Sequence, residues 1–148
     1  MAKSYRQGFY RPINPTKYLG DPTNIVYRSS WELKFMKWLD MSSSCISWAS
    51  EEMAIPYRSP VDDRIHRYFI DFKITLKQSD DNTKTYLVEV KPLHQTLPPK
   101  NTKNKKTLME SVMTYQVNLA KWDAAKKYCQ SNGWEFKIIT EQELGIKK

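Results

Sequence analysis

Two runs of alternating apolar and polar residues, joined by a short polar segment, constrain this chain more than any other feature. Residues 65–76 read IHRYFIDFKITL and residues 85–92 read TYLVEVKP, with the turn-prone segment QSDDNTK between them. Alternation with a period of two is typical of β-strands, and Asp, Asn and Ser favour turns. The sequence therefore predicts a β-hairpin. Its first strand places Ile70, Phe72, Ile74 and Leu76 on one face. Its second strand places Tyr86, Val88 and Val90 on one face, and Leu87, Glu89 and Lys91 on the other.

The hairpin brings two carboxylates together. Residue numbers that pair in an antiparallel hairpin have a constant sum, and a turn centred on Asp80 makes that sum 160. Asp71 and Glu89 then face each other with their Cβ atoms ~5 Å apart. Like charges in this position are destabilising unless a cation lies between them. Because side chains alternate along a strand, Lys91 shares the face of Glu89.

Two carboxylates and an ammonium at one strand end suit a hard divalent cation. Oxygen ligands favour Mg²⁺ or Mn²⁺, and nothing in the residues suggests zinc. A lysine beside such a metal can orient or deprotonate a water and stabilise charge that develops on a phosphate. The alternative is a surface trio of salt-bridged residues on a solvated sheet face. Aromatic and branched residues in both strands and the basic character of the rest of the chain weigh against this alternative.

A helix is predicted upstream of the hairpin, in the segment RSSWELKFMKWLD at residues 28–40. Ser29 and Glu32 have the spacing of a capping box at its start. The remaining pattern gives one apolar stripe, while Lys34 and Lys37 face outward. The stripe contains Trp31, Glu32, Phe35, Met36, Trp38 and Leu39. An acid on an otherwise apolar face is a candidate site residue, although a glutamate at the third helical position is also explained by capping alone.

The remaining elements complete a mixed α/β domain over residues 1–148. We predict a strand within residues 46–58, a helix over residues 107–131 and a last strand over residues 134–140. The stripe of that helix contains Val112, Tyr115, Leu119 and Trp122, and Gly133 ends it in a left-handed cap. The order is helix, three strands, helix, strand, which predicts a mixed sheet with helices packed on it. The first three strands are expected to be antiparallel, and the last to be parallel to its neighbour.

The charge balance indicates a polyanionic partner. The chain has 24 Lys and Arg residues against 16 Asp and Glu residues, a net charge of +8. Nucleic acid is the common partner of such a chain, although a solvated basic surface is the alternative. The excess is concentrated in an irregular arm at residues 1–24 and in a mobile loop at residues 93–106, where His94 is a loop residue. No apolar run reaches the ~18 residues of a membrane span. The segment MAKSYRQGFY lacks an apolar signal core, so we expect no secretion, and Cys45 and Cys129 are expected to be reduced.

The ordered motif resembles a known nuclease family. Glu32 on a helix, IDF around Asp71 and VEVK up to Lys91 are similar to the PD-(D/E)XK nuclease motif, and the order of elements matches its restriction-endonuclease-like core. Longer segments resemble one branch, the head completion nucleases of T-even-type tailed phages, with a more distant similarity to TnsA-type transposon endonucleases. These segments are YRSSWELKFMKWLD, IPYRSPVDDRIHRYFIDF, YLVEVKP and TYQVNLAKWDAAKKYC. The resemblance covers about residues 5 to 145, with Ile70 where many members have proline.

The resemblance implies a metal site and a catalytic lysine. Asp71 and Glu89 take the two acid positions that bind Mg²⁺ (or Mn²⁺), and the main-chain carbonyl of Val90 is a further ligand. Lys91 takes the position of the catalytic lysine, and Glu32 that of the helical glutamate, which completes the metal site, often through water. Gln116 is a weaker candidate for an active-site contact, since a solvated helix amide explains it equally well. For His66 a phosphate contact is favoured over proton transfer.

The resemblance also implies that the chain is a metal-dependent enzyme that hydrolyses phosphodiester bonds of double-stranded DNA and leaves 5′-phosphates. Its role would be to trim or cut packaged phage DNA during head completion, in contact with head or portal-neck proteins, in the virion and the host cytoplasm. We expect DNA to follow a basic track made of Arg6, Arg11, Lys17, Arg28, His66, Arg67, Lys100, Lys103, Lys105 and Lys106. The alternatives are a non-catalytic DNA-binding or head–tail joining protein and a transposon or repair endonuclease subunit. An RNA-binding module is disfavoured because the aromatic strand motifs of the common RNA-binding fold are lacking.

Overall fold

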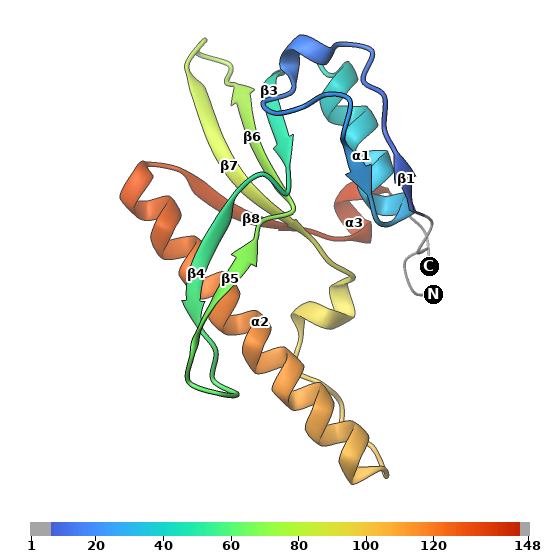
Figure 1. Cartoon of the computed structure of the whole chain (residues 1–148), viewed down its shortest axis with the longest axis vertical. Coiled ribbons are helices and arrows are strands. Elements are labelled where there is room, and N and C mark those ends of the chain that lie inside the picture. The colour runs from blue at the N-terminus through green and yellow to red at the C-terminus, as the bar shows by residue number, and fades with distance from the viewer. Residues whose placement is uncertain (1–6, 146–148) are drawn as a thin grey trace.

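The hairpin predicted from the alternating runs lies at the centre of the fold (Figure 1). The structure is a computed structural model, and it describes residues 7–145. In chain order the elements are β1 (Gly8–Phe9), η1 (Pro15–Lys17), β2 (Val26–Tyr27), α1 (Ser30–Met41), β3 (Cys45–Ser50), β4 (Ala54–Arg58), β5 (Ile65–Phe69), β6 (Phe72–Lys77), β7 (Thr83–Val90), η2 (Leu93–Thr96), α2 (Lys105–Asn132), β8 (Glu135–Ile139) and α3 (Glu141–Leu144).

The main sheet has four strands in the order β3-β6-β7-β8. Strands β3, β6 and β7 are antiparallel and β8 is parallel to β7, as predicted. The predicted register is also confirmed. Phe72 pairs with Val88 and Lys77 pairs with Thr83, and the residue numbers of each pair add up to 160. The turn closes where its composition indicated, with the amide of Gln78 donating to the carbonyl of Asn82 at 2.7 Å.

Two of the predicted strands are each divided in two. The segment 46–58 contributes to β3 and β4, and the segment 65–76 contributes β5 and β6, so that β4 and β5 form a separate antiparallel pair. The division falls at Ile70 and Asp71, whose backbone groups bond to Met53 and Glu51 outside the sheet. Ile70 therefore packs with Leu87 rather than with Phe72, and the prediction that it shares the face of Phe72 is wrong.

The sheet separates two hydrophobic cores. One lies beneath α1 and contains Phe35, Trp48, Phe72 and Val88 with their neighbours. The other lies between the sheet, the β4–β5 hairpin and α2, and Leu87 and Trp122 belong to it (Figure 1). The alternation predicted for β7 is thus confirmed. On α1 the predicted stripe is buried except for Trp38, which is 49% exposed.

Helix α2 begins at Lys105, earlier than expected, because the side chain of Asn104 caps it by accepting hydrogen bonds from the amides of Lys106 and Thr107. Lys105 and Lys106 therefore belong to the helix and not to the loop, and η2 interrupts the segment expected to be irregular. Gly133 ends α2 with a φ of 70°, the left-handed cap that was predicted. The buried residues of α2 are Asn118, Trp122, Ala125 and Cys129, whereas Leu119 of the predicted stripe is 44% exposed.

The N-terminal arm is anchored to α1 by a buried carboxylate. Asp40 is fully buried and accepts hydrogen bonds from the Tyr10 hydroxyl at 2.5 Å and from the amides of Ile13 and Asn14 at 2.7 and 3.0 Å. The ammonium of Lys17 donates to the carbonyls of Asp40 and Ser42, which end α1. Residues 10–17 of the predicted basic arm therefore pack around the end of this helix.

Both cysteines are free and buried, one in each hydrophobic core. Within residues 7–145, no helix combines the length and the apolar character that crossing a membrane requires.

Candidate active site

The two predicted carboxylates meet at one end of the β6–β7 pair. Asp71 immediately precedes β6, and its Oδ2 accepts a hydrogen bond of 2.9 Å from the amide of Val90, next to Glu89. Glu89 is 6% exposed and points toward the face of the sheet that α2 covers, since its neighbour Leu87 packs there. The ammonium of Lys91 lies 3.7 Å from Oε2 of Glu89. The backbone register therefore brings the predicted trio together.

A tyrosine that the sequence did not single out holds Glu89. The hydroxyl of Tyr68, on β5, donates a hydrogen bond of 2.6 Å to Oε1 of Glu89. Burial raises the pKa of Tyr68 far above its ordinary value, and the charge of Glu89 and this hydrogen bond raise it further. The phenol consequently stays protonated and remains a donor. The ammonium of Lys121 lies 5.6 Å from the centroid of the same ring, where a cation is attracted to the aromatic face.

Arg28 lies beside several acids at the start of α1. Its Nε is 3.1 Å from Oε2 of Glu51. The hydrogen bond to Glu51 and the negative charge of Glu51 raise the pKa of the guanidinium, and the charges of Glu32 and Asp71 raise it further. Glu51 has a positive φ of 53°, and its amide donates to the carbonyl of Asp71 at 3.1 Å. This connection ties the β3–β4 junction to the site.

Glu32 combines burial with a capping bond. It is 5% exposed, its amide donates to the side chain of Ser29, and its Oε1 accepts a hydrogen bond of 3.1 Å from the amide of Arg28. The predicted cap is therefore present, with the glutamate reaching back to residue 28 rather than to Ser29 itself. The charges of Glu32 and Asp71 both raise the pKa of Arg28.

The residues that could hold a metal supply oxygen only. Among residues 7–145 no group of three or more His, Cys, Asp and Glu side chains gathers as a metal site. Two carboxylates, from Asp71 and Glu89, and the adjacent main-chain carbonyl of Val90 remain as donors. Hard oxygen donors of this kind fit Mg²⁺, which binds through one or two carboxylates and keeps several waters.

The predicted basic residues differ in their surroundings. Arg11, Arg28, Arg67 and the four lysines Lys100, Lys103, Lys105 and Lys106 are exposed. Lys17 is half-buried, and its ammonium donates hydrogen bonds to carbonyls at the end of α1. Arg6 lies outside the described residues. Figure 1 shows the start of α2, with the lysine-rich segment before it, at the end of the molecule away from α1.

Two weaker candidates lie outside the carboxylate cluster. His66 is exposed on β5, and its Nε2 is 2.8 Å from Oδ2 of Asp62 in the loop of the same hairpin. Gln116 is exposed on α2.

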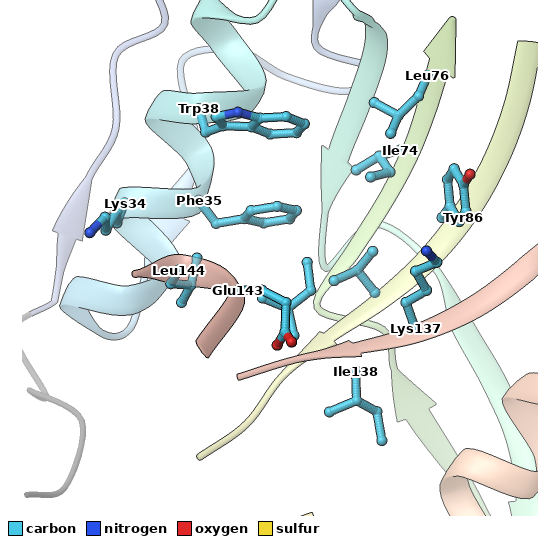
Figure 2. Close-up of a pocket in the computed structure, with 12 residues that line it drawn as sticks. Lys34, Phe35, Trp38, Ile74, Leu76, Tyr86, Lys137, Ile138, Glu143 and Leu144 are labelled. Carbon is cyan, nitrogen blue, oxygen red and sulfur yellow. The ribbon is translucent and has the colours of Figure 1, made fainter. Parts of the chain in front are cut away.

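A hollow of about 610 Å³ lies on the opposite face of the sheet (Figure 2). Phe35, Trp38, Ile74 and Tyr86 contribute apolar walls, and Lys137 stands at its edge. Val88 also lines it, and side chains alternate along β7, so Glu89 points away from this hollow. The hollow is therefore separate from the carboxylate cluster.

Comparison with known proteins identifies the family. Residues 42–141 match the model of the TnsA-like endonuclease N-terminal domain. The chain belongs to the TnsA-like endonuclease family. The matched segment contains Asp71, Glu89 and Lys91, while Arg28 and Glu32 precede it. Along 142 residues the chain is 37% identical to the head completion nuclease of Enterobacteria phage T4, covering 93% of this chain and 92% of that protein.

Membership of the TnsA-like family places the domain in the restriction-endonuclease-like fold and supports a nuclease role. The sequence singled out Asp71, Glu89 and Lys91, which the structure brings together, but it did not single out Tyr68 or Glu51. Tyr68 is three residues before Asp71 within the alternating run, and only the division of that run at Ile70 turns it toward Glu89. Neither residue carries a sequence signal of its own.

Proposed function

We propose that this protein is a metal-dependent nuclease that hydrolyses phosphodiester bonds of DNA. The observation that carries the proposal is the convergence of Asp71, Glu89 and Lys91 at one end of the β6–β7 pair, with 3.7 Å between the ammonium and Glu89. In a basic, TnsA-like chain, a cluster of two acids and a lysine suits a phosphate substrate.

The carboxylates of Asp71 and Glu89 and the carbonyl of Val90 would hold Mg²⁺, with Mn²⁺ as a substitute. When bound, the metal neutralises charge that develops on the phosphate and lowers the pKa of water. The ammonium of Lys91 orients the attacking water against the phosphorus. The water oxygen bonds to phosphorus and releases a proton to the solvent, the bond from phosphorus to the 3′ oxygen breaks, and the 3′ oxygen takes a proton from the solvent. The products are a 5′-phosphate and a 3′-hydroxyl.

Glu32 has a positioning role in this proposal. Its burial and its bond to the amide of Arg28 fix the start of α1 beside the cluster. From there it would complete the metal site through a water molecule. Its capping role alone accounts for its burial, so the proposed mechanism does not depend on it.

DNA would lie along the exposed cations nearest the cluster. Arg28 and Arg67 stand closest in the sequence to the catalytic elements, and the lysines around the start of α2 extend the track (Figure 1). We leave Lys17 out, because its ammonium already serves the end of α1. Contacts of this kind supply affinity for the backbone and little choice of sequence.

The biological role we propose follows the relative from phage T4, whose name is head completion nuclease. The protein would trim or cut packaged DNA so that a filled phage head can accept a tail. It would then work in the infected host cell and in the virion, beside head or portal-neck proteins.

Removal of divalent metal is expected to abolish cleavage. Linear and supercoiled DNA incubated with the protein and Mg²⁺ should be cut, and EDTA should stop the reaction because the proposed mechanism uses the metal to neutralise charge on the phosphate. Gel electrophoresis of the products is the measurement, and restoring excess Mg²⁺ is the control. Intact DNA with every metal tested would favour a non-catalytic DNA-binding protein.

Replacement of Tyr68 by phenylalanine is expected to slow cleavage by roughly tenfold to a hundredfold, the usual effect of losing a group that orients a metal ligand. The hydroxyl is the only part removed, so the core should be preserved. Tyr57→Phe is the matched control, since Tyr57 is buried on the paired strand β4. Mn²⁺ affinity measured by calorimetry should fall for Tyr68→Phe alone. Equal behaviour of the two variants would remove Tyr68 from the site.

A further inference from the structure

Phe69 is an exposed aromatic residue two positions before Asp71. It is the last residue of β5, 49% exposed, and follows the buried Tyr68. Because side chains alternate along the strand, it lies on the outer face of the β4–β5 hairpin together with Arg67. The guanidinium carbon of Arg67 stands 5.1 Å from the centroid of its ring.

The ring forms one wall of a hollow of about 420 Å³. The other walls are mainly polar and include Asn24, Arg28, Glu51 and Glu52. This hollow borders the cluster directly, since the amide of Glu51 donates to the carbonyl of Asp71 and Arg28 is within the field of the Asp71 carboxylate. A group held there lies next to the position at which a phosphate would be cut.

The chemistry of the walls matches a nucleobase. An aromatic ring offers a surface on which any base can stack, and an arginine beside the ring strengthens such a platform. Carboxylates accept hydrogen bonds from the amino groups of cytosine and adenine, and an arginine donates to guanine. A second phosphate fits this hollow less well, because two of its walls carry carboxylates.

We propose that this hollow receives an unpaired base of the DNA strand that is cut, with Phe69 as its stacking surface. The inference rests on the proposed nuclease function and deepens it by naming the substrate class. A base inside a duplex is stacked on both sides and has no free face for Phe69. The preferred substrate is therefore DNA with a single-stranded segment beside the scissile bond, such as a frayed end or a fork.

The test measures binding, so that it does not depend on cleavage. The Lys91→Ala protein, with and without Phe69→Ala, is titrated into a fluorescent forked DNA and into a fully paired duplex of the same length, and anisotropy is recorded. Phe69→Ala should weaken binding to the fork by roughly tenfold, within the range of base–aromatic stacking, and leave binding to the duplex unchanged. Phe69→Trp should retain fork binding, and unaltered thermal unfolding should accompany each variant.

Trp38→Ala is the matched control, because Trp38 is also 49% exposed but lines the hollow on the other face of the sheet. It should change neither affinity. Equal losses on both DNAs, or no loss on the fork, would overturn the inference. If the unaltered protein cuts duplex DNA in Mg²⁺ while Phe69→Ala binds forks normally, the inference fails and the nuclease function stands. If no DNA is cut while the Phe69 effect is present, the nuclease function fails.

Discussion

Lys91→Ala is expected to lower the rate of DNA cleavage by roughly two to three orders of magnitude, the range found when a group that stabilises charge at the reacting centre is removed. The ammonium lies 3.7 Å from Glu89 at the strand end, and its side chain is 25% exposed, so its removal takes away the cation that faces the substrate. DNA binding, measured by anisotropy, should be retained within a few-fold, since backbone affinity comes from many cations.

Lys77→Ala is the matched control for this variant. Lys77 lies at the far end of β6, is exposed and forms an ion pair with the side chain of Asp81. Its loss should leave the cleavage rate unchanged. Cleavage that survives in Lys91→Ala would remove the lysine from the mechanism, whereas equal loss of cleavage and binding would indicate a misfolded protein.

Asp40→Ala is expected to lower the free energy of unfolding by about 3 kcal/mol, because the three hydrogen bonds that the buried carboxylate accepts are lost at once. Chemical denaturation monitored by tryptophan fluorescence measures this loss. Asp21→Ala is the control, since the exposed side chain of Asp21 accepts hydrogen bonds from Thr23 within its own turn. A similar small loss for both variants would mean that the arm contributes little to stability.

The same carboxylate makes stability depend on pH. Burial raises the pKa of Asp40, but the hydrogen bonds from Tyr10, Ile13 and Asn14 outweigh it and hold the pKa below the ordinary value of 3.8. A folded-state pKa below the unfolded one adds stability above the unfolded value and loses it as the pH falls through the folded value. The free energy of unfolding should therefore fall below about pH 4, and Asp40→Asn should flatten this fall. An equal slope in the two proteins would contradict the assignment.

The carboxylate cluster could be predicted from the sequence because its geometry depends on local rules. Alternation fixed which side chains share a face, and the polar residues between 78 and 82 fixed where the chain turns. Together they place Asp71 opposite Glu89, which the pairing of Phe72 with Val88 confirms for the adjacent residues. The parallel last strand follows in the same way from the helix that precedes it.

The division of the long strand at Ile70 could not be predicted in this way. The alternating pattern continues through the break, and the partners that cause it, Met53 and Glu51, are distant in the sequence. Tyr68 reaches Glu89 only because of this break. The surroundings of Lys17 and Leu119 could not be predicted either. The sequence shows that Lys17 is basic and that Leu119 is apolar, but it does not show which groups lie next to each side chain in the fold. The ammonium of Lys17 bonds to the carbonyl of Asp40 at the end of α1, and Leu119 lies on the exposed face of α2.

The turn between Gln78 and Asn82 is exposed and lies at the opposite end of the hairpin from Asp71 and Glu89 (Figure 1). One extra residue within β6 would rotate the following side chains to the other surface and separate the acids. Extra residues in the turn leave the strand pairs as they are. This loop is therefore where a fluorophore or an affinity tag can be attached while the protein keeps its chemistry.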